Sequence, residues 1–417
     1  MAVRQASSPR NQSCQEESKK LSTIGSCRGR KRRTQIPPKK EAGFVLWTIL
    51  KNAIGKDLTR IPLPVDFNEP LSFIQRMTEC MESSSLLTEA AKCSDPAMQM
   101  CHVAAFVLSS WSNSPYRLSK PFNALWGETY ECDRMEDLGW RSIAEQVSHH
   151  PPIGAIKTEG TCWELEEDMQ VVSQFQKTSI KVTPQGVSTL ILNGNTTYTW
   201  AKGDIRTILR GFIMGPLTLH NEGDIIIFSE TTQLKCHLHL SKQSSFFSTT
   251  SPENRQFHGK VMDGHGKKLI KVEGNWTSHF DVVDAKGNST RLWTKTNIPT
   301  PDQEKFYNFS KFTVELNETE EGVAPTDSRN RPDMRLMENG EWDKANAEKA
   351  RLEQKQREVM KKIMNGSDSV KYITERPVWF KKTVENGAVR YRYQGRYWDA
   401  KMKQDWSVCP EIYFKEK

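Results

Sequence analysis

Two adjacent histidines followed by two prolines form the group in this sequence whose residue types could do chemistry. His149 and His150 stand before Pro151 and Pro152, at the end of the string EQVSHHPP that begins at Glu145. Proline favours an extended backbone in the residue before it and has no N–H to donate, so the string predicts a strand end or rim. Side chains alternate along a strand, so both rings can serve one site only if the backbone turns here. Imidazoles donate hydrogen bonds to anions and gain charge when an anion binds, which makes the pair a candidate anion site.

Structural and metal-binding roles are the alternatives for these histidines. A histidine with satisfied hydrogen bonds is a common structural residue, and that role stays open. A metal site is disfavoured, because no Cys or acidic residue stands beside the pair at ligand spacing. His237 and His239 would share one face of a strand but lack a third ligand nearby, so we expect surface or cross-strand roles for them. The sequence predicts neither a metal nor a cofactor.

The stretch Ser119–Glu131 (SKPFNALWGETYE) is a second polar segment of interest. Lys120 precedes Pro121 and is therefore biased towards an extended or turn conformation, and Gly127 permits a tight bend. By its type alone, Lys120 is expected to be a solvated surface lysine. A binding role for this segment therefore depends on what lies near it in the fold.

A charged helix is predicted over Trp342–Ile363, because most of this segment consists of strong helix formers without Gly or Pro. Lys349, Glu353 and Arg357 follow one another at intervals of four residues and therefore share one stripe of that helix. By composition alone, the stripe is an intrahelical ladder of ion pairs on a solvated face.

The chain between residues 140 and 276 predicts a series of antiparallel strands. Short segments rich in β-branched and aromatic residues alternate there with turn signals such as Asn193-Gly194. Helices do not alternate with these strands, which favours a large curled or closed antiparallel sheet over a parallel one. Leu71–Ser110 has a helical pattern and is expected to pack against the sheet, whereas Phe306–Glu318 looks like a last long strand.

Positive charge is concentrated at the N-terminus. Residues 1–40 contain 11 Lys and Arg against 2 Asp and Glu, a net charge of +9, whereas the other 377 residues carry a net charge of −1. This tail is poor in apolar residues and is expected to be disordered. Its basic core, Arg28–Lys40, has three interpretations: a solvated linker, a patch for anionic lipid headgroups, or a nuclear-import or nucleic-acid patch. No nucleic-acid-binding fold follows it, so we expect no nucleic-acid partner.

The apolar residues of this chain form no segment that we expect to cross a membrane. No run of about 18 apolar residues and no apolar N-terminal stretch occurs, so neither a membrane span nor a secretory signal is expected. The nine cysteines form no CxxC pair, which is typical of reduced thiols in the cytoplasm. Within Gly43–Arg60, Leu46, Trp47, Leu50 and Ile54 recur at helical spacing. This amphipathic helix would either pack on the body or act as a movable lid over a lipid cavity.

The string EQVSHHPP resembles the signature of the oxysterol-binding protein family, and the resemblance extends from about Gly43 to Ile412. Further similar stretches are IPLPVDFNEPLS (61–72), SKPFNALWGETYE (119–131), APTDSRNRPDMRLMENGEWDKANAEKARLEQKQR (324–357) and YWDAKMKQDWSVCPEIY (397–413). The resemblance implies a mainly β fold with helices (α+β), in which a large antiparallel, incomplete β-barrel encloses a lipid tunnel, with an N-terminal amphipathic lid and helical layers. The implied domains are a basic disordered tail (1–42) and a lipid-binding domain (43–417), the latter divided into lid (43–60), helical segment (61–118), barrel (119–320) and C-terminal helical subdomain (321–417).

The resemblance also implies a site for a phosphoinositide headgroup, in which the helix stripe faces the tunnel mouth and its glutamate orients the two cations. The implied headgroup residues are Lys120, Asn123, His149, His150, Lys349, Glu353 and Arg357, and the implied lid and tunnel residues are Leu46, Trp47, Leu50 and Ile54. After the asparagine that matches Asn123, members of the family usually continue with Pro-Leu-Leu-Gly-Glu. This chain has Ala124 in place of the proline, which loosens the turn, and Trp126 in place of the second leucine, which adds bulk near the tunnel entrance.

Lipid transfer is the function that the resemblance implies: one sterol or one phosphatidylinositol 4-phosphate is bound in turn in one tunnel and exchanged between membranes. The alternatives are a sterol-responsive scaffold or sensor, and transfer of another lipid such as phosphatidylserine. The sequence has no GxSxG, HExxH or Walker motif, so we expect no enzyme. The expected partners are the two lipids and anionic membranes contacted peripherally, and the sequence identifies no protein partner for targeting. The expected location is cytoplasmic and peripheral, at contact sites of the endoplasmic reticulum, Golgi or endosomes.

Overall fold

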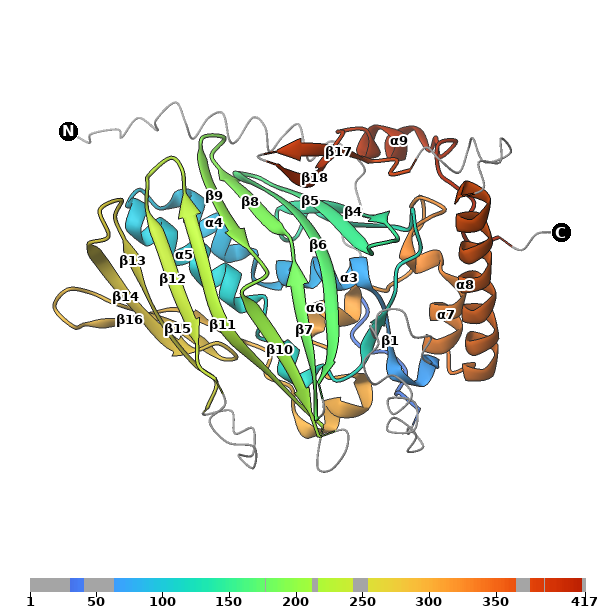
Figure 1. The fold of residues 1–417 in the computed structure, drawn as a ribbon, viewed down its shortest axis with the longest axis horizontal. Coiled ribbons are helices and arrows are strands. Elements are labelled where there is room, and N and C mark those ends of the chain that lie inside the picture. The colour runs from blue at the N-terminus through green and yellow to red at the C-terminus, as the bar shows by residue number, and fades with distance from the viewer. Residues whose placement is uncertain are drawn as a thin grey trace.

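A 14-stranded sheet dominates the computed structural model (Figure 1). The structure describes residues 31–40, 64–176, 178–211, 217–242, 254–364, 376–385 and 387–414. The strand order is β16-β15-β14-β13-β12-β11-β10-β7-β6-β5-β4-β3, with β8 and β9 paired beside this path. The strands are β3 (Thr129–Arg134), β4 (Trp140–Ser148), β5 (Ile153–Gly160), β6 (Trp163–Gln176), β7 (Ser179–Gln185), β8 (Val187–Leu192), β9 (Thr196–Ala201), β10 (Ile205–Arg210), β11 (Thr218–Ser229), β12 (Lys235–Leu240), β13 (Gln256–Met262), β14 (Lys268–Asn275), β15 (His279–Val283) and β16 (Ser289–Thr294).

The sheet is an incomplete barrel built mainly from strands that are neighbours in the sequence. Short turns join them, and the predicted turn at Asn193-Gly194, where both residues have positive φ, connects β8 to β9. The end strands β3 and β16 are not paired with each other in the part of the chain that the structure describes. The predicted fold class, a mainly β chain with a large incomplete antiparallel barrel and helical layers, is confirmed.

Three helices supply the layer that packs on the sheet, namely α3 (Phe73–Thr78), α4 (Ser85–Lys92) and α5 (Pro96–Ser109). Asp95 caps α5 by accepting a hydrogen bond from the Ala97 N–H, and Pro96 occupies the first turn, where its missing N–H costs nothing. Val103 and Phe106 of this helix belong to the same buried cluster as Leu238 of the sheet. The helical layer predicted for Leu71–Ser110 is therefore confirmed from residue 73 onward.

Residues 31–40 lie as an irregular segment against the body. Ile36 is 5% exposed in the main core, and the Arg33 N–H donates to Glu318 Oε1 (3.0 Å). The Lys39 N–H donates to the Lys305 carbonyl (2.8 Å). This packing differs from the disordered tail expected through residue 42, because one apolar side chain and an acidic partner hold the segment. The predicted lid residues lie outside the described residues: Leu46, Trp47, Leu50 and Ile54.

The segment Phe306–Glu318, expected as a last long strand, is helical instead. It follows the 3-10 helix η6 (Pro301–Phe306) and contains the short helix α6 (Lys311–Glu315), whose N-cap Ser310 accepts a hydrogen bond from the Thr313 N–H. Phe312 is buried inside this helix, and Phe309 is buried just before its N-cap. The strand prediction was wrong because aromatic content favours strands as well.

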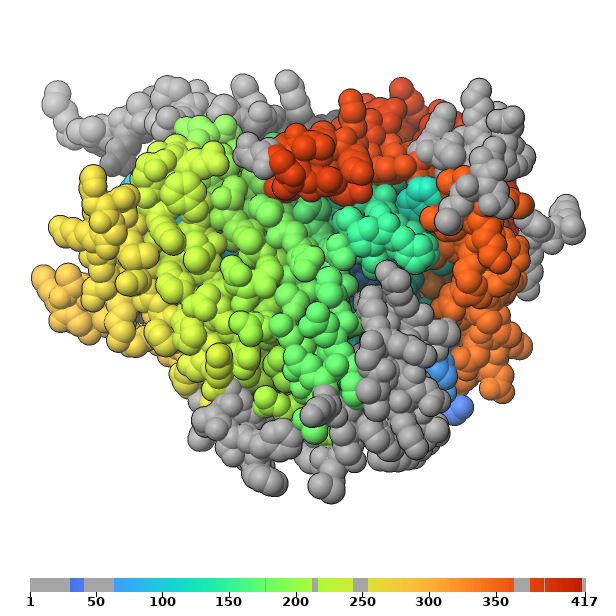
Figure 2. All heavy atoms as spheres, viewed as in Figure 1, coloured from blue at the N-terminus to red at the C-terminus, as the bar shows by residue number. Residues whose placement is uncertain are grey.

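The C-terminal part combines helices with a hairpin. Its elements are α7 (Pro332–Glu338), α8 (Trp342–Met364), β17 (Phe380–Glu385), β18 (Ala388–Tyr393) and α9 (Tyr397–Lys403). The helix predicted over Trp342–Ile363 is confirmed, and the segment 321–417, expected as a C-terminal helical subdomain, also contains the strands β17 and β18. Figure 2 shows these orange and red segments against the green strands, and β18 contacts β5 and β6.

The remaining elements are short. They are η2 (Val65–Phe67), β1 (Asn68–Ser72), η3 (Glu79–Ser83), η4 (Ser114–Tyr116), β2 (Lys120–Phe122) and η7 (Ser328–Asn330). β1 and β2 pair in parallel as a separate two-stranded sheet. Within the described ranges, no helix has both the length and the apolar character needed to cross a membrane.

Candidate functional site

The two histidines lie in the turn that connects β4 to β5. β4 ends at Ser148 and β5 begins at Ile153, so the backbone turns at the paired rings, as their joint use of one site requires. The ring centroids of His149 and His150 are 4.1 Å apart with an angle of 41° between the ring planes. His149 is half-buried and His150 is exposed. The strand end predicted from the prolines is confirmed, and the two imidazoles form one polar group at its rim.

Gln356 of α8 connects this turn to two other parts of the chain. Its side-chain Nε2 lies 3.1 Å from each ring nitrogen of His149. Its Oε1 accepts a hydrogen bond from the Trp126 N–H at 2.7 Å. The histidine turn, the loop after β2 and α8 therefore adjoin at one polar contact, which sequence analysis did not identify.

Burial, and to a smaller extent the neighbouring His150, lowers the pKa of His149 to about 4. His149 is therefore neutral near pH 7 in the ligand-free structure. A bound phosphate would reverse this situation, because a nearby negative charge favours the protonated imidazole. An anion bound beside His149 would therefore favour uptake of a proton by this imidazole.

Glu145 of the same motif holds the C-terminal segment against β4. Its buried carboxylate accepts hydrogen bonds from the backbone N–H groups of Val378 (2.7 Å) and Trp379 (2.9 Å). Burial raises the pKa of Glu145 to about 7, although the backbone hydrogen bonds and the nearby Arg376 act in the opposite direction. Glu145 is thus a structural clamp, placed a few residues before the histidines on the same strand.

Arg376 contacts Trp126 as well: Gln356 binds the backbone N–H of Trp126, and Arg376 binds its backbone carbonyl. Its Nη1 donates to the Trp126 carbonyl at 2.6 Å, and its guanidinium carbon lies 5.1 Å from the centre of the Trp126 ring. The Trp126 Nε1 is 3.4 Å from the Val147 carbonyl, two residues before His149. The tryptophan that departs from the family pattern therefore joins α8, β4 and the C-terminal segment.

A buried arginine, Arg331, holds the backbone of Asn123 in place. Arg331 is 1% exposed and donates from Nη1 to the Asn123 carbonyl at 2.7 Å. The same guanidinium pairs with Glu128 (2.9 Å) and Asp333 (2.8 Å), so its charge is compensated. Lys120 is half-buried on β2, and Asn123 is exposed just after this strand.

The predicted stripe of α8 is present. Lys349 Nζ lies 2.7 Å from Glu353 Oε1, as the ion-pair ladder requires, and Lys349 is buried. Arg357 is exposed and donates from Nε to Gln354 Oε1 at 3.1 Å. One turn before Lys349, Asn346 Oδ1 accepts a hydrogen bond from the Val65 N–H, which joins α8 to the chain entering β1.

Apolar packing fixes the position of α8 relative to the loop after β2. Leu352 of α8 forms a buried cluster with Leu125, Ile412 and Tyr413. Leu125 stands next to Trp126, so the cluster keeps Gln356 within reach of the loop after β2. The α8 residues that make these contacts are Asn346, Leu352 and Gln356, and they lie along one side of the helix. Lys349 and Glu353 lie on the same side.

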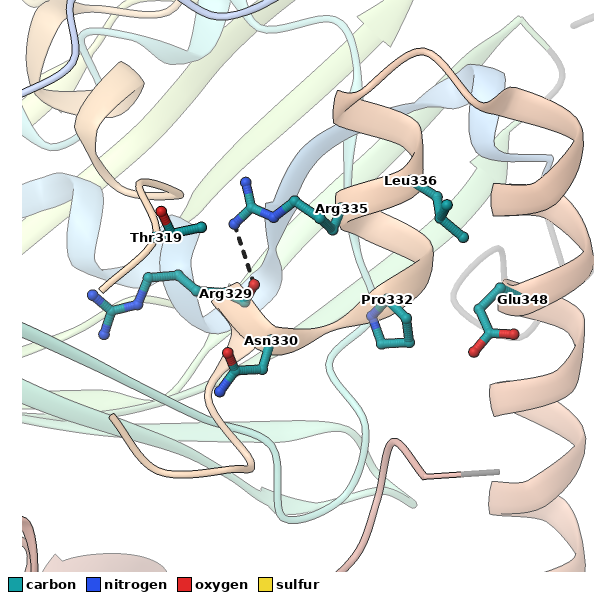
Figure 3. A pocket seen from close by; sticks show the side chains of 7 residues that line it. All are labelled: Thr319, Arg329, Asn330, Pro332, Arg335, Leu336 and Glu348. Carbon is teal, nitrogen blue, oxygen red and sulfur yellow. Dashed lines mark hydrogen bonds between the residues drawn. The ribbon is translucent and has the colours of Figure 1, made fainter. Parts of the chain in front are cut away.

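A separate open hollow of about 510 Å³ lies between α7 and α8 (Figure 3). It is lined by Thr319, Arg329, Asn330, Pro332, Arg335, Leu336 and Glu348. Its two arginines are engaged by the protein itself: Arg335 donates to the Arg329 carbonyl at 3.2 Å, and Arg329 pairs with Asp327 at 2.8 Å. The hollow therefore offers an anion little that is not already used, and we assign it no role.

His237 and His239 lie on one face of β12, and both contact Asp224 of the neighbouring strand. Their ring nitrogens are 2.7 and 3.0 Å from the same Asp224 oxygen. They are cross-strand residues at the surface, as predicted. No three His, Cys, Asp or Glu side chains in the described ranges are arranged to hold a metal ion.

Comparisons with known proteins agree with this fold over nearly the whole chain. Residues 45–402 match the family model described as oxysterol-binding protein. Oxysterol-binding protein 2 from Mus musculus is 39% identical over 416 residues, which cover 92% of this chain and 44% of that protein. Oxysterol-binding protein-related protein 1B from Arabidopsis thaliana is 37% identical over 394 residues, which cover 92% of this chain and 77% of that protein. The chain thus spans less than half of the mouse relative's length.

Two solved structures have the same architecture. The ORD domain of Osh1 in complex with ergosterol has a TM-score of 0.85 and 30% identity, and the match covers 98% of this chain and 100% of that one. The ORD of Osh3 from Saccharomyces cerevisiae, in complex with PI(4)P, has a TM-score of 0.79 and 31% identity, with 92% of this chain and 99% of that one covered. With the family model, these matches show that the chain belongs to the oxysterol-binding protein family.

Proposed function

We propose that this chain binds one sterol or one phosphatidylinositol 4-phosphate at a time inside its barrel and exchanges the two lipids between membranes. Relatives with the same fold were solved with ergosterol, with cholesterol and with PI(4)P. The observation in the present chain that carries the proposal is the contact of Gln356 with His149, which joins the histidine turn to the cationic side of α8.

The proposed headgroup site uses the chemistry of a phosphate monoester. Such a group carries about −1.5 to −2 charges near neutral pH and has three strong acceptor oxygens. The proposed ligands are Lys120, Asn123, His149, His150, Lys349 and Arg357, with Glu353 orienting Lys349 through their ion pair. Two lysines, one arginine and two protonatable imidazoles can neutralise the phosphate, and hydrogen bonds to charged groups are the stronger kind.

The sterol would occupy the apolar interior in place of the acyl chains, so that one lipid excludes the other. The lid is part of this proposal: the apolar face formed by Leu46, Trp47, Leu50 and Ile54 would cover the entrance, and its opening would limit the exchange rate. The proposed division of the chain has a basic segment up to residue 42 and a lipid-binding domain over 43–417.

Lipid exchange requires contact with two membranes and no bond-making chemistry. The chain is therefore proposed to act as a non-enzymatic carrier that touches membranes peripherally, at contact sites of the endoplasmic reticulum with the Golgi or endosomes. Phosphatidylinositol 4-phosphate in one membrane would compete with sterol for the barrel interior. A gradient of this phosphoinositide between two membranes would then drive sterol transport.

Competition between the two lipids tests this function. A fluorescent sterol is loaded into the protein and titrated with a short-chain phosphatidylinositol 4-phosphate, with short-chain phosphatidylinositol as the phosphate-free control. We expect the phosphorylated lipid to displace the sterol, and the double variant His149→Ala, His150→Ala to keep sterol binding while losing displacement. His265→Ala, an exposed histidine in the turn after β13, is the matched control. Sterol that is displaced equally well from the double variant would contradict the site, and displacement by neither lipid would contradict a shared cavity.

A further inference from the structure

The hairpin of β17 and β18 is firmly anchored at its base. Phe380 and Tyr391 are buried in a cluster with Val147 and Trp398. Immediately before β17, the Val378 and Trp379 N–H groups donate to the Glu145 carboxylate. The base of the hairpin is therefore fixed to the strand that leads into the histidine turn.

Two arginines of β18 fix the hairpin to β6 as well. Arg390 Nε lies 2.6 Å from Asp168 Oδ2, and this ion pair is buried. Arg392 Nη1 lies 2.7 Å from Glu166 Oε2, and the same guanidinium also pairs with Glu385 of β17. That pairing lowers the pKa of Glu385 to about 2, so this carboxylate stays ionised and its charge is compensated by Arg392.

Two apolar side chains are exposed near the tip of the hairpin. Val384 is 71% exposed and Val389 is 46% exposed, and the two residues are directly opposite each other in the strand pairing. Cross-strand neighbours of this kind present a joint apolar surface on one face of the ribbon. On β18 the same face is buried at Tyr391 and becomes exposed at Val389, whereas on β17 the exposed Lys382 lies on this face between the buried Phe380 and Val384.

Two exposed lysines accompany this apolar tip. Lys381 and Lys382 are exposed on β17, two to three residues before Val384, and side chains at successive positions point to opposite faces. The tip therefore carries apolar groups at its end and positive charge just behind them. An exposed apolar patch rimmed by polar groups marks an interaction site, and the positive rim selects a negatively charged partner.

We propose that the tip of the β17–β18 hairpin, formed by Val384, Val389, Lys381 and Lys382, docks on the surface of an anionic lipid bilayer. The valines would enter the boundary between headgroups and acyl chains, while the lysines would remain among the anionic headgroups. The Arg390–Asp168 ion pair anchors the hairpin as far out as Thr383, which is opposite Arg390, so the two valines form the first cross-strand pair beyond the anchored part. This inference rests on the proposed lipid exchange, since it gives the carrier a rigid membrane contact built onto the strand of the histidine motif.

Vesicle flotation tests the docking surface with matched variants. The double variant Val384→Thr, Val389→Thr keeps side-chain shape and branching in the strand but removes two apolar groups. Its control is Ile298→Thr, which changes a side chain 53% exposed in the loop after β16. For charge, Lys381→Gln, Lys382→Gln is compared with Lys267→Gln, Lys268→Gln, which alters two exposed lysines at the start of β14. Each protein is floated with phosphatidylcholine vesicles, with and without phosphatidylserine.

The expected result is a loss of vesicle binding that is confined to the hairpin variants. The valine variant should bind roughly tenfold more weakly to both kinds of vesicle. The lysine variant should lose about fivefold per lysine on vesicles with phosphatidylserine and nothing on neutral vesicles. Unchanged binding of both hairpin variants would overturn the proposal, and so would an equal loss in the control variants. Concentration-dependent self-association that the valine variant abolishes would overturn it in favour of a second copy as the occupant.

Sterol binding in solution separates this inference from the proposed function. All variants should bind the fluorescent sterol delivered from cyclodextrin as the unmodified chain does, because no substitution touches the barrel interior. Vesicle binding that depends on the hairpin in a chain that binds no sterol would support the docking surface and contradict lipid exchange. Normal sterol binding with hairpin-independent vesicle binding would do the reverse.

Discussion

The side-chain amide of Gln356 lies 3.1 Å from the ring of His149, although 207 residues separate the two in the chain. The other end of the same amide accepts the Trp126 N–H at 2.7 Å. One side chain therefore holds together the histidine turn, the loop that carries Asn123 and the helix that carries Lys349 and Arg357. The proposed headgroup site depends on this contact, because its cations come from segments that no local structure links.

Loss of the Gln356 amide should weaken phosphoinositide binding without unfolding the chain. In Gln356→Ala, neither His149 nor the Trp126 N–H keeps its partner, and we expect roughly tenfold weaker binding of short-chain phosphatidylinositol 4-phosphate. Sterol binding should stay within about twofold. Gln174→Ala, which changes an exposed glutamine of β6, is the control. Equal losses for the sterol and the phosphoinositide would indicate a general structural role instead.

Binding of the phosphoinositide should be coupled to proton uptake. His149 is neutral at pH 7 because burial lowers its pKa to about 4, and a bound phosphate raises that pKa again. Affinity should therefore rise as the pH falls from the raised pKa of the bound state towards about 4, by up to about tenfold per pH unit for one proton taken up. Calorimetric titrations in buffers of different ionisation enthalpy measure this proton directly. A variant His149→Asn should bind with little proton uptake; full uptake in that variant would place the proton elsewhere.

The lowered pKa also makes a stability prediction of definite sign. The unfolded chain protonates His149 near its ordinary value of 6.5, whereas the folded chain does so only near 4. The free energy of unfolding should therefore fall as pH drops from about 6.5 towards 4, since the unfolded state binds more protons there. Urea titrations of His149→Asn should show less of this acid loss than the unmodified chain. An identical pH profile for both would contradict the assigned protonation state.

The barrel and α8 could be predicted from the sequence because both depend on local patterns. Residues rich in β-branched side chains between turn signals became β6 to β14, and the run of helix formers became α8. The segment Phe306–Glu318 failed by the same logic: it has aromatic residues typical of strands, but Ser310 caps a helix there. Aromatic content alone does not distinguish a strand from a helix here, whereas the hydrogen bond from the Thr313 N–H to Ser310 and the burial of Phe312 within α6 belong to the helix.

The candidate site was only partly accessible to sequence reasoning. His149, Lys120 and the α8 stripe have recognisable types and spacing, whereas Gln356 looks like one more polar residue on a solvated helix. Arg376 contacts Trp126 across 250 residues, and no periodicity reports such a pairing. One sequence signal did point to these contacts: Trp126 stands where the family usually has leucine, and a bulky residue in a tight loop needs additional neighbours.

Removal of the Glu145 carboxylate should loosen the C-terminal segment. Glu145→Ala leaves the buried N–H groups of Val378 and Trp379 without their acceptor, at a cost of about 2 to 4 kcal/mol in the free energy of unfolding. Urea unfolding measures the loss. Glu136→Ala, at an exposed position in the turn before β4, should change stability by less than about 0.5 kcal/mol. A similarly small change for Glu145→Ala would show that the clamp contributes nothing.

Arg331 should be needed for both stability and the position of Asn123. Arg331→Met leaves Glu128 and Asp333 as buried, unpaired carboxylates, which we expect to cost about 3 to 5 kcal/mol in unfolding free energy. Arg206→Met, at an exposed position on β10, is the control and should be nearly neutral. If Arg331→Met were as stable as the control, the buried network of Arg331, Glu128 and Asp333 would not support the loop that carries Asn123.

Sterol transport between two liposome populations tests the exchange mechanism most directly. Transfer of a fluorescent sterol is followed with and without phosphatidylinositol 4-phosphate in the acceptor membrane, for the unmodified chain, for His149→Ala, His150→Ala, and for the control His265→Ala. We expect the phosphoinositide to accelerate sterol delivery by the unmodified chain and the control, and the double variant to lose this acceleration while still carrying sterol. Acceleration that survives in the double variant would contradict the histidine turn as the headgroup site. Sterol binding without any transfer by the unmodified chain would contradict exchange itself and favour a sterol-responsive scaffold.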